Sequence, residues 1–406
     1  MRIEDLHTID WVLLGALLLL FVAQVYWYAR YMAAVARRIR RDKKSVSQEQ
    51  SEPSDLPGVS VVLCAHNESE NLSQYLQALL TQDYPLYEVI VVDDGSEDDT
   101  RAVIERYMTH DSRLRMTFVP YGARVGSTKK LALTLAAKAA QYDYLLLTDA
   151  DCCPESNQWI AQMMKGFQRP MTNDQLPTDI VLGFSPYFEE KGHVNRLVRF
   201  DTLFNGLHYL GAAICGHPYM GVGRNLAYRK SMFFESGGFT QLMTNKAGDD
   251  DLFVNHVATR QNTAVVVSRE SYMWSPSKKT FKEWWQQKRR HLSVSPAYRE
   301  QTKLRLALEP LTRGLFYAAV IATIVFACLR YPMVCLNLEF GLWELLLSAA
   351  VGVFLIRWIV QTAILNTSAR RMGLRRFSMF SILWFDISLP LVNLWMLIVP
   401  KKQTKW

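Results

Sequence analysis

Two acidic motifs in the middle of the chain have side chains that can hold a cation or a hydroxyl group. Asp149-Ala150-Asp151 follows the apolar run Leu145–Leu147. A turn just past a strand would bring these two carboxylates together, and such a pair can hold Mg²⁺ or Mn²⁺ while a diphosphate supplies further oxygens. Asp93 and Asp94 also follow an apolar run, where a carboxylate can accept hydrogen bonds from a base or a ribose. The alternatives are a chance Asp-x-Asp and an ordinary Asp-Asp-Gly-Ser turn.

Two further motifs could take part in chemistry. Three consecutive carboxylates, Asp249 to Asp251, repel one another unless a cation, a basic neighbour or solvent screens them. An acid whose pKa is raised in this way would suit a general base, and a solvated acidic loop is the alternative. In the stretch 284–291, Gln and Arg side chains could grip a diphosphate while a Trp stacks on a sugar. The same stretch could instead be a basic helix resting at a membrane interface.

The elements that must position these motifs alternate between strand and helix. Apolar runs predict strands at 59–64, 87–92, 116–119 and 144–148, with helices at 71–80, 98–109 and 129–140. This alternation predicts an α/β domain with a mostly parallel sheet covered on both faces. The first two acidic motifs then lie at the carboxyl ends of strands, where open α/β sheets bind ligands.

Apolar segments at both ends of the chain predict a membrane protein. Trp11–Ala29 contains no charged residue and is long enough for one crossing. A cluster of Arg and Lys follows it, so the positive-inside bias places the N-terminus outside and the chain from Arg30 in the cytosol.

Three more apolar segments follow residue 310: Gly314–Leu329, Leu345–Thr367 and Phe377–Val399. We expect the first two to form a membrane hairpin. The third has basic residues on both sides, so it either ends outside against the charge bias or dips in and returns around Pro390.

The distribution of charge and the spacing of the cysteines argue against a nucleic-acid-binding protein and against a zinc site. The net charge of +8 comes largely from basic residues beside the apolar segments, where they contact anionic headgroups, so nucleic acid is not an expected partner. The six cysteines show no zinc-type spacing, and we expect reduced thiols in a cytosolic domain.

The ordered set of motifs resembles the family 2 glycosyltransferases, especially the membrane-bound synthase-like branch related to chitin, cellulose, hyaluronan and poly-N-acetylglucosamine synthases. The resemblance runs from about Val59 to His291. The stretch 61–68 looks like the family's Pro-x-x-Asn-Glu start, with Ala65-His66 in place of the proline. The stretch 127–133 resembles its Gly-Lys-x-x-Ala-Leu segment, and 223–229 with 237–239 resembles its acceptor-side block.

The resemblance implies a GT-A-type nucleotide-sugar-binding domain and a role for each matching residue. The expected donor-binding residues are Asn67, Glu68, Asp93, Asp94, Lys129, Asp149, Gln287 and Arg290. The expected metal ligands for Mg²⁺ or Mn²⁺ are Asp149 and Asp151. The expected catalytic base is Asp249, with Asp250 a close second, and the expected acceptor-side residues are Asn225, Asp251 and Trp285.

Two departures from the family pattern affect these expectations. Gly248-Asp249 stands where Glu-Asp is usual, which sets the register of the base. His291 replaces the Trp of Gln-x-x-Arg-Trp, a motif that accompanies chain-extending synthases, so processivity is left open.

We therefore expect an integral protein of the inner or plasma membrane with four parts. These are a transmembrane helix at 1–30, a basic segment and linker at 31–58, a cytosolic catalytic domain at 59–300 and a membrane region of two or three segments at 310–400. The expected reaction is an inverting transfer from a nucleotide sugar, expected to be a UDP-sugar, to a lipid-linked or polysaccharide acceptor at the cytosolic membrane face. Membrane lipids are expected partners, and an export partner is left open.

Three rival functions remain. The first is a non-processive transferase that adds one sugar to a lipid. The second is a membrane-anchored nucleotidyltransferase, although the Gly-rich basic loop that such enzymes favour is missing from Cys64–Asn71. The third is a transporter or channel, which four or fewer spans around a large polar domain argue against.

Overall fold

The computed structural model describes residues 8–45, 56–120, 122, 125–168, 177–244, 247–330 and 342–398. Residues 1–7 of the expected first helix, 46–55 of the expected basic segment and linker, the loop of the expected hairpin and residues 399–400 of the expected membrane region lie outside the described residues.

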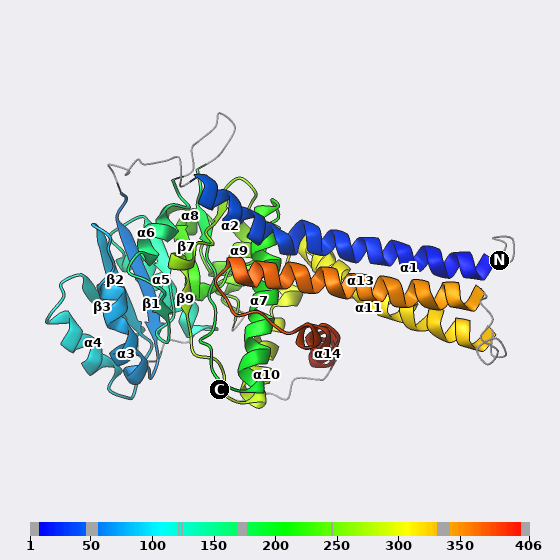
Figure 1. Cartoon of the computed structure of the whole chain (residues 1–406). Helices are drawn as coiled ribbons and strands as arrows, with labels where there is room; N and C mark the ends of the chain where they lie inside the picture. The colour runs from blue at the N-terminus through cyan, green and yellow to red at the C-terminus, as the bar shows by residue number, and fades with distance from the viewer. Residues whose placement is uncertain are drawn as a thin grey trace.

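A seven-stranded sheet lies at one end of the molecule, and the long apolar helices extend away from it (Figure 1). Its order is β3 (Leu114–Phe118), β2 (Tyr87–Asp93), β1 (Val59–Ala65), β4 (Tyr144–Leu147), β7 (Leu226–Arg229), β6 (Ile180–Leu182) and β8 (Thr263–Val265). Only β7 runs antiparallel to its neighbours, so the predicted mostly parallel sheet is confirmed. A two-stranded sheet joins β5 (Cys153–Pro154) to β9 (Met273–Trp274).

Helices cover the sheet because its central strands are apolar on both faces. Six of the seven residues of β1 are buried, as expected for a strand between two helical layers. The helices of this part are α3 (Ser69–Leu80), α4 (Thr100–Met108), α5 (Thr128–Ala139), α6 (Trp159–Met164), α7 (His193–Ile214), α8 (Lys230–Glu235), α9 (Asp251–Val257) and α10 (Phe281–Leu292). One apolar core contains residues of α3, α4 and α6, and a second contains residues of α5 and α7.

Four described helices are long and apolar enough to cross a membrane, judged by length and composition. The first is continuous from α1 (Thr8–Trp27) through a π-helical turn (Tyr28–Met32) into α2 (Ala33–Ser45). The others are α11 (Glu300–Arg330), α13 (Leu342–Arg371) and α14 (Met379–Ile398). In Figure 1, α1, α11 and α13 extend side by side away from the sheet, whereas α14 is seen nearly end-on beside them.

The α/β pattern and the helices at both ends of the chain are thus confirmed. Observed strands and helices in 59–148 match the predicted ones within two residues at each end. The exact domain boundaries stay predictions.

Candidate active site

Neighbouring parallel strands bring the first two acidic motifs to one edge of the sheet. β1 pairs in parallel with both β2 and β4, so the loops that follow these three strands lie side by side. Cys64, at the end of β1, lies within electrostatic reach of Lys129, Asp149, Asp249 and Asp94. Residues from four distant parts of the sequence therefore converge at this edge.

A lysine joins the second and third motifs. Lys129 Nζ lies 3.1 Å from Asp149 Oδ1 and 3.2 Å from Asp249 Oδ2. It stands in the first turn of α5, which begins there because Ser127 Oγ accepts a hydrogen bond from the Lys130 backbone N–H. Burial lowers the pKa of Lys129, but the nearby carboxylates more than offset this and raise it well above its usual value. Of its side chain, 43% is exposed.

The three carboxylates of the acidic triplet have different surroundings. Burial raises the pKa of Asp249, but the attraction of Lys129 and Lys130 and the hydrogen bonds to the carboxylate together outweigh it, so the net shift is downward and the raised pKa expected for a base is not found at this residue. Asp250 is the N-cap of α9, and its two oxygens accept hydrogen bonds from the backbone N–H groups of Gly223 (2.7 Å) and Asp251 (2.8 Å). Burial and the charge of Asp249 raise the pKa of Asp250. Thus Asp249 faces the converging charges, whereas Asp250 holds the loop and starts the helix.

Asp251 lies behind the site, where its side chain is largely shielded. Its carboxylate accepts hydrogen bonds from the Leu252 backbone N–H (2.7 Å) and the Tyr298 hydroxyl (3.0 Å), and only 8% of the residue is exposed. Burial, followed by the charge of Asp250, raises the pKa of Asp251 to about 8.

Asp149 and Asp151 form a group of oxygen ligands suited to a hard divalent cation. One ligand atom from each of them and from Cys152 lie within 4.8 Å of one another. Burial raises the pKa of the Cys152 thiol, which donates to Asp151 Oδ1, so the sulfur is protonated and is a poor ligand. Burial and the charge of Asp149 raise the pKa of Asp151, a repulsion that a cation would relieve. The donor set of two carboxylates therefore fits Mg²⁺ or Mn²⁺.

The loops after β1 and β2 place the remaining donor-side residues. Asn67, at φ 57°, accepts a hydrogen bond from the Glu97 backbone N–H, and Asp93 accepts one from the Ser96 backbone N–H. Glu68 accepts from Asn71 Nδ2 at 2.5 Å and lies in the electrostatic field of Asp149 and Asp151.

Helix α10 places the fourth motif opposite the carboxylates. A capping box between Thr280 and Glu283 starts this helix. Gln287 Nε2 donates to the Tyr187 hydroxyl at 3.2 Å, and Arg290 is exposed. His291 lies in the combined field of Arg290, Arg224, Lys288 and Asp249, so the end of α10 faces the site.

Like Asp251, the other two residues expected on the acceptor side have side chains that are buried or half-buried. Asn225 is fully buried, accepts a hydrogen bond from Trp159 Nε1 and donates to the carbonyl groups of Phe184 and Ser271. It therefore supports the loop after β6, and its expected acceptor-side role stays a prediction. Trp285 is half-buried and packs against the larger core.

Sequence reasoning missed two cations near the carboxylates. The Arg224 guanidinium lies 4.4 Å from the centroid of the Tyr187 ring and in the field of Asp149 and Asp151. Its Nη1 is buried and has no hydrogen-bond partner among the described residues. Lys278 is exposed, and its positive charge favours the ionised forms of Asp151 and Glu68. The basic residue in Gly223-Arg224-Asn225 was the available signal for Arg224.

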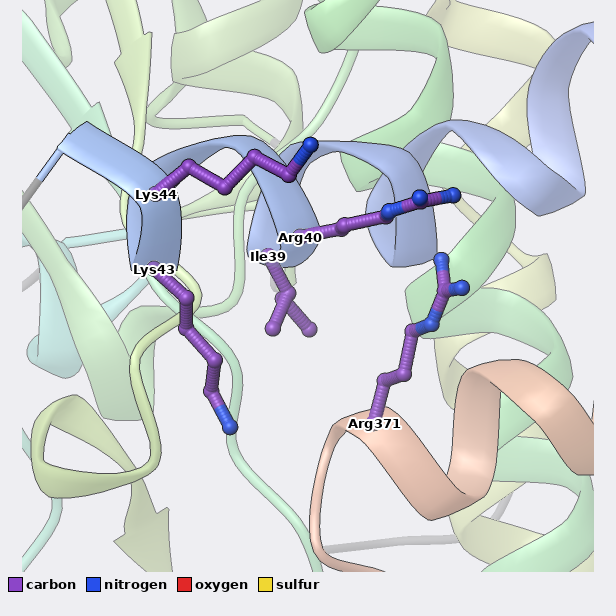
Figure 2. Close-up of a pocket in the computed structure, with 5 residues that line it drawn as sticks. All are labelled: Ile39, Arg40, Lys43, Lys44 and Arg371. Atoms are coloured by element: carbon purple, nitrogen blue, oxygen red, sulfur yellow. The ribbon is translucent and has the colours of Figure 1, made fainter.

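A separate cavity of about 380 Å³ lies away from these carboxylates. Figure 2 shows its lining, which consists of Ile39 and four cationic side chains, Arg40, Lys43, Lys44 and Arg371. The cations come from α2 and from the end of α13, beside the helices that could cross a membrane. This cavity has the wrong side chains for metal-assisted chemistry.

Comparison with known proteins identifies the class of enzyme. Over 101 residues the chain is 34% identical to a poly-beta-1,6-N-acetyl-D-glucosamine synthase of Staphylococcus epidermidis, which covers 25% of this chain and 23% of that protein. Over 243 residues it is 25% identical to the probable glycosyltransferase YdaM of Bacillus subtilis, which covers 58% and 54%. The chain thus matches between about a quarter and about half of the length of these curated relatives. These relatives are named as glycosyltransferases or synthases, the class of enzyme that the sequence predicted.

The family follows from a match over most of the chain. The model of glycosyl transferase family 21 matches residues 20–394, and the chain belongs to this family. The predicted likeness to synthase-like glycosyltransferases is confirmed, and the family that matches is family 21. Among solved structures, a mannosyltransferase of Pyrobaculum calidifontis in complex with GDP-Man and Mn²⁺ superposes with a TM-score of 0.49 and 18% identity, over 87% of this chain and 99% of that one.

Proposed function

We propose that this glycosyltransferase moves a sugar from a nucleotide-sugar donor, of the UDP-sugar class, to an acceptor hydroxyl at the cytosolic face of a membrane. The observation that carries the proposal is the arrangement Asp149–Lys129–Asp249, in which one lysine bridges carboxylates from two motifs about a hundred residues apart. This arrangement brings Lys129, which can bind a diphosphate, next to Asp249, which can accept a proton.

The reaction is an inverting, in-line displacement at the anomeric carbon. Asp249 accepts the proton of the acceptor hydroxyl while the oxygen of that hydroxyl forms the new bond to the anomeric carbon. The bond from that carbon to the diphosphate oxygen breaks, and the diphosphate leaves with both electrons. Asp249 suits the base role better than Asp250 because both Asp250 oxygens already accept backbone hydrogen bonds.

The leaving diphosphate needs positive charge around it. Lys129, which lies between Asp149 and Asp249, and Arg224, with an unmade hydrogen bond at Nη1, supply that charge from the protein. Asp149 and Asp151 would hold Mg²⁺ or Mn²⁺, which when bound neutralises charge that develops on the diphosphate. Asn67, Glu68, Asp93 and Asp94 line the nucleotide end, and Gln287 and Arg290 approach from α10.

The membrane placement follows from charge and length. The N-terminus lies outside, α1 crosses the bilayer, and the basic helix α2 begins the cytosolic part. The acceptor is a lipid-linked sugar, a glycolipid or a growing polysaccharide. A single addition to a lipid is the second candidate, favoured by His291 at the end of α10, where a chain-extending synthase has Trp.

The proposal is tested with the full chain purified in detergent. Nucleotide release is measured with a panel of UDP- and GDP-sugars, a membrane lipid extract as acceptor, and Mg²⁺ or Mn²⁺. We expect release with one donor class that stops in excess chelator and in Asp151→Asn. Release that persists in chelator would exclude the metal, and incorporation of a nucleotide into the product would favour the nucleotidyltransferase instead.

A further inference from the structure

The sequence does not decide whether helix α14 crosses the membrane or returns to the side from which it enters. Its length and composition fit a membrane span. In Figure 1, however, it is seen nearly end-on, whereas α1, α11 and α13 are seen from the side. A helix that crosses the direction of the other three does not traverse a bilayer together with them.

The contacts of α14 place it where the bundle meets the catalytic side of the molecule. The Phe385 ring lies 4.8 Å from the ring of Phe200 in α7, and α14 also contacts α10. Asp386 is fully buried and accepts hydrogen bonds from Arg313 of α11 (3.0 Å) and Arg357 of α13 (2.9 Å). Charged groups from α11 and from the middle of α13 therefore fix α14 against the side of the bundle.

The depth of this contact follows from helix geometry. Gln361 donates to both the Tyr28 hydroxyl (2.8 Å) and Asp386 (2.7 Å), so α14 lies at the level of Tyr28. Helix α1, which ends just before Tyr28, has 20 residues. At about 1.5 Å per residue it is about 30 Å long, the thickness of the hydrocarbon layer. When the far end of α1 is placed at one boundary of the hydrocarbon layer, α14 lies at the opposite boundary.

The outward side of α14 is strongly apolar. Five large side chains at helical spacing are between 61% and 76% exposed: Phe380, Trp384, Leu391, Trp395 and Ile398. The opposite side carries the buried residues Ile382, Phe385, Asp386 and Leu389. An apolar face of this size in water would be costly, and Trp side chains favour the membrane interface.

We propose that α14 does not cross the membrane but lies in the plane of the leaflet on the catalytic side, with its Phe380–Trp384–Leu391–Trp395 face against the acyl chains. A helix in this position has its apolar face about 5–10 Å deep, at the boundary between headgroups and acyl chains. Both ends of α14 are then on the same side as the sheet. The proposal uses the membrane placement proposed above for α1, α11 and α13, and the two can fail separately.

Thiol labelling tests which side each end occupies. In full-length protein with native cysteines replaced by serine, Met379→Cys and Ile398→Cys mark the two ends of α14, and Leu329→Cys marks the far end of α11. In intact cells an impermeant maleimide should label only the Leu329 position, and permeabilised cells should allow labelling at the other two. Labelling of Ile398→Cys but not Met379→Cys in intact cells would show that α14 crosses and would overturn the proposal. Labelling of both α14 positions but not Leu329→Cys would retain the flat helix and reverse the orientation of the whole protein.

Depth measurement tests what covers the apolar face. A spin label at Trp384→Cys, in protein reconstituted into phospholipid vesicles, should collide with oxygen as a lipid-exposed site does. It should lie shallower than a label at Ile321→Cys, an exposed position within α11. Equal depth at the two positions would overturn the proposal. A Trp384 label shielded from both oxygen and a water-soluble relaxant would also overturn it, since a protein would then cover the face.

Discussion

At the scale of single residues, the acidic triplet shows how neighbouring positions acquire different properties. Asp249 forms an ion pair with Lys129, Asp250 is the N-cap of α9, and Asp251 is buried and accepts a hydrogen bond from Tyr298. The sequence motif predicts three acids in one place. The choice of Asp249 over Asp250 came from the resemblance to the family and not from the three acids themselves, because which of them faces the site depends on how the loop packs against α5 and Tyr298.

The raised pKa of Asp251 predicts a pH-dependent stability. A carboxyl with a folded-state pKa of about 8, against 3.8 in the unfolded chain, holds a proton more tightly when folded. It favours the folded state fully below about pH 4, and this contribution is lost as the pH rises to about 8. We therefore expect Asp251→Asn, which cannot titrate, to lose less melting temperature between pH 5 and pH 8 than the wild type. An equal change in melting temperature between pH 5 and pH 8 in the two proteins would contradict the raised pKa of Asp251.

Arg224 predicts a loss of diphosphate affinity. Hydrogen bonds to charged groups contribute about 1.5–3 kcal/mol, so Arg224→Gln should weaken binding of UDP in the presence of Mn²⁺ roughly 10- to 100-fold. Isothermal titration calorimetry measures this change. Arg269→Gln is the matched control, because Arg269 pairs with Glu155. Equal affinity of the Arg224 variant and the wild type would remove Arg224 from the donor site.

At the scale of elements, the periodic parts of the sequence were predictable and the loop supports were not. Strand β1 is a single apolar run and α3 carries a regular stripe of Leu, so their bounds follow from the pattern. β6 and β8 have only three residues each and gave no such signal. The resemblance of 223–229 to the family's acceptor-side block gave Asn225 its expected role, but the sequence did not predict that its side chain is buried and connects three segments.

Asn225 therefore predicts a stability defect. Removing its amide leaves Trp159 Nε1 and two carbonyl groups without their partner, and each such buried group costs about 1–3 kcal/mol. Asn225→Ala should lower the melting temperature by several degrees and leave the acceptor KM unchanged at a temperature where the protein is folded. Asn205→Ala, on the exposed side of α7, is the control. A changed acceptor KM without a loss of stability would restore the acceptor-side role.

At the scale of the whole molecule, a buried polar network connects the four apolar helices. Gln24, Arg313, Arg357, Gln361 and Asp386 exchange hydrogen bonds across α1, α11, α13 and α14. In the sequence these residues only interrupt apolar segments. Their meaning requires the long-range pairing of helices, since Gln24 and Arg357 are separated by 333 positions.

The cationic cavity in Figure 2 predicts a preference for anionic lipid. It lies on the cytosolic side of the proposed spans, beyond Tyr28, where a lipid headgroup would supply the anion, and each Lys or Arg near an anionic surface contributes about 1 kcal/mol. Arg40→Gln with Lys44→Gln should therefore weaken binding of phosphatidylglycerol roughly 20- to 30-fold. Native mass spectrometry of the detergent-purified protein measures this.

Controls separate charge from site and lipid from free anion. Arg106→Gln with Lys138→Gln removes the same charge from α4 and α5, within the sheet part of the molecule, and should leave lipid binding unchanged. An equal loss in both double variants would show that only net charge matters. Equal competition by inorganic phosphate would show a phosphate site without lipid preference.

The most direct test of the account is the rate of sugar transfer by Asp249→Asn under single-turnover conditions, with UDP binding measured on the same protein. The substitution preserves shape but removes the proton acceptor that faces Lys129. A general base contributes about 10²- to 10⁴-fold, so the transfer rate should fall by that order while UDP affinity changes little. Near-normal transfer by Asp249→Asn would contradict the account, and loss of transfer in Asp250→Asn alone would move the base by one residue.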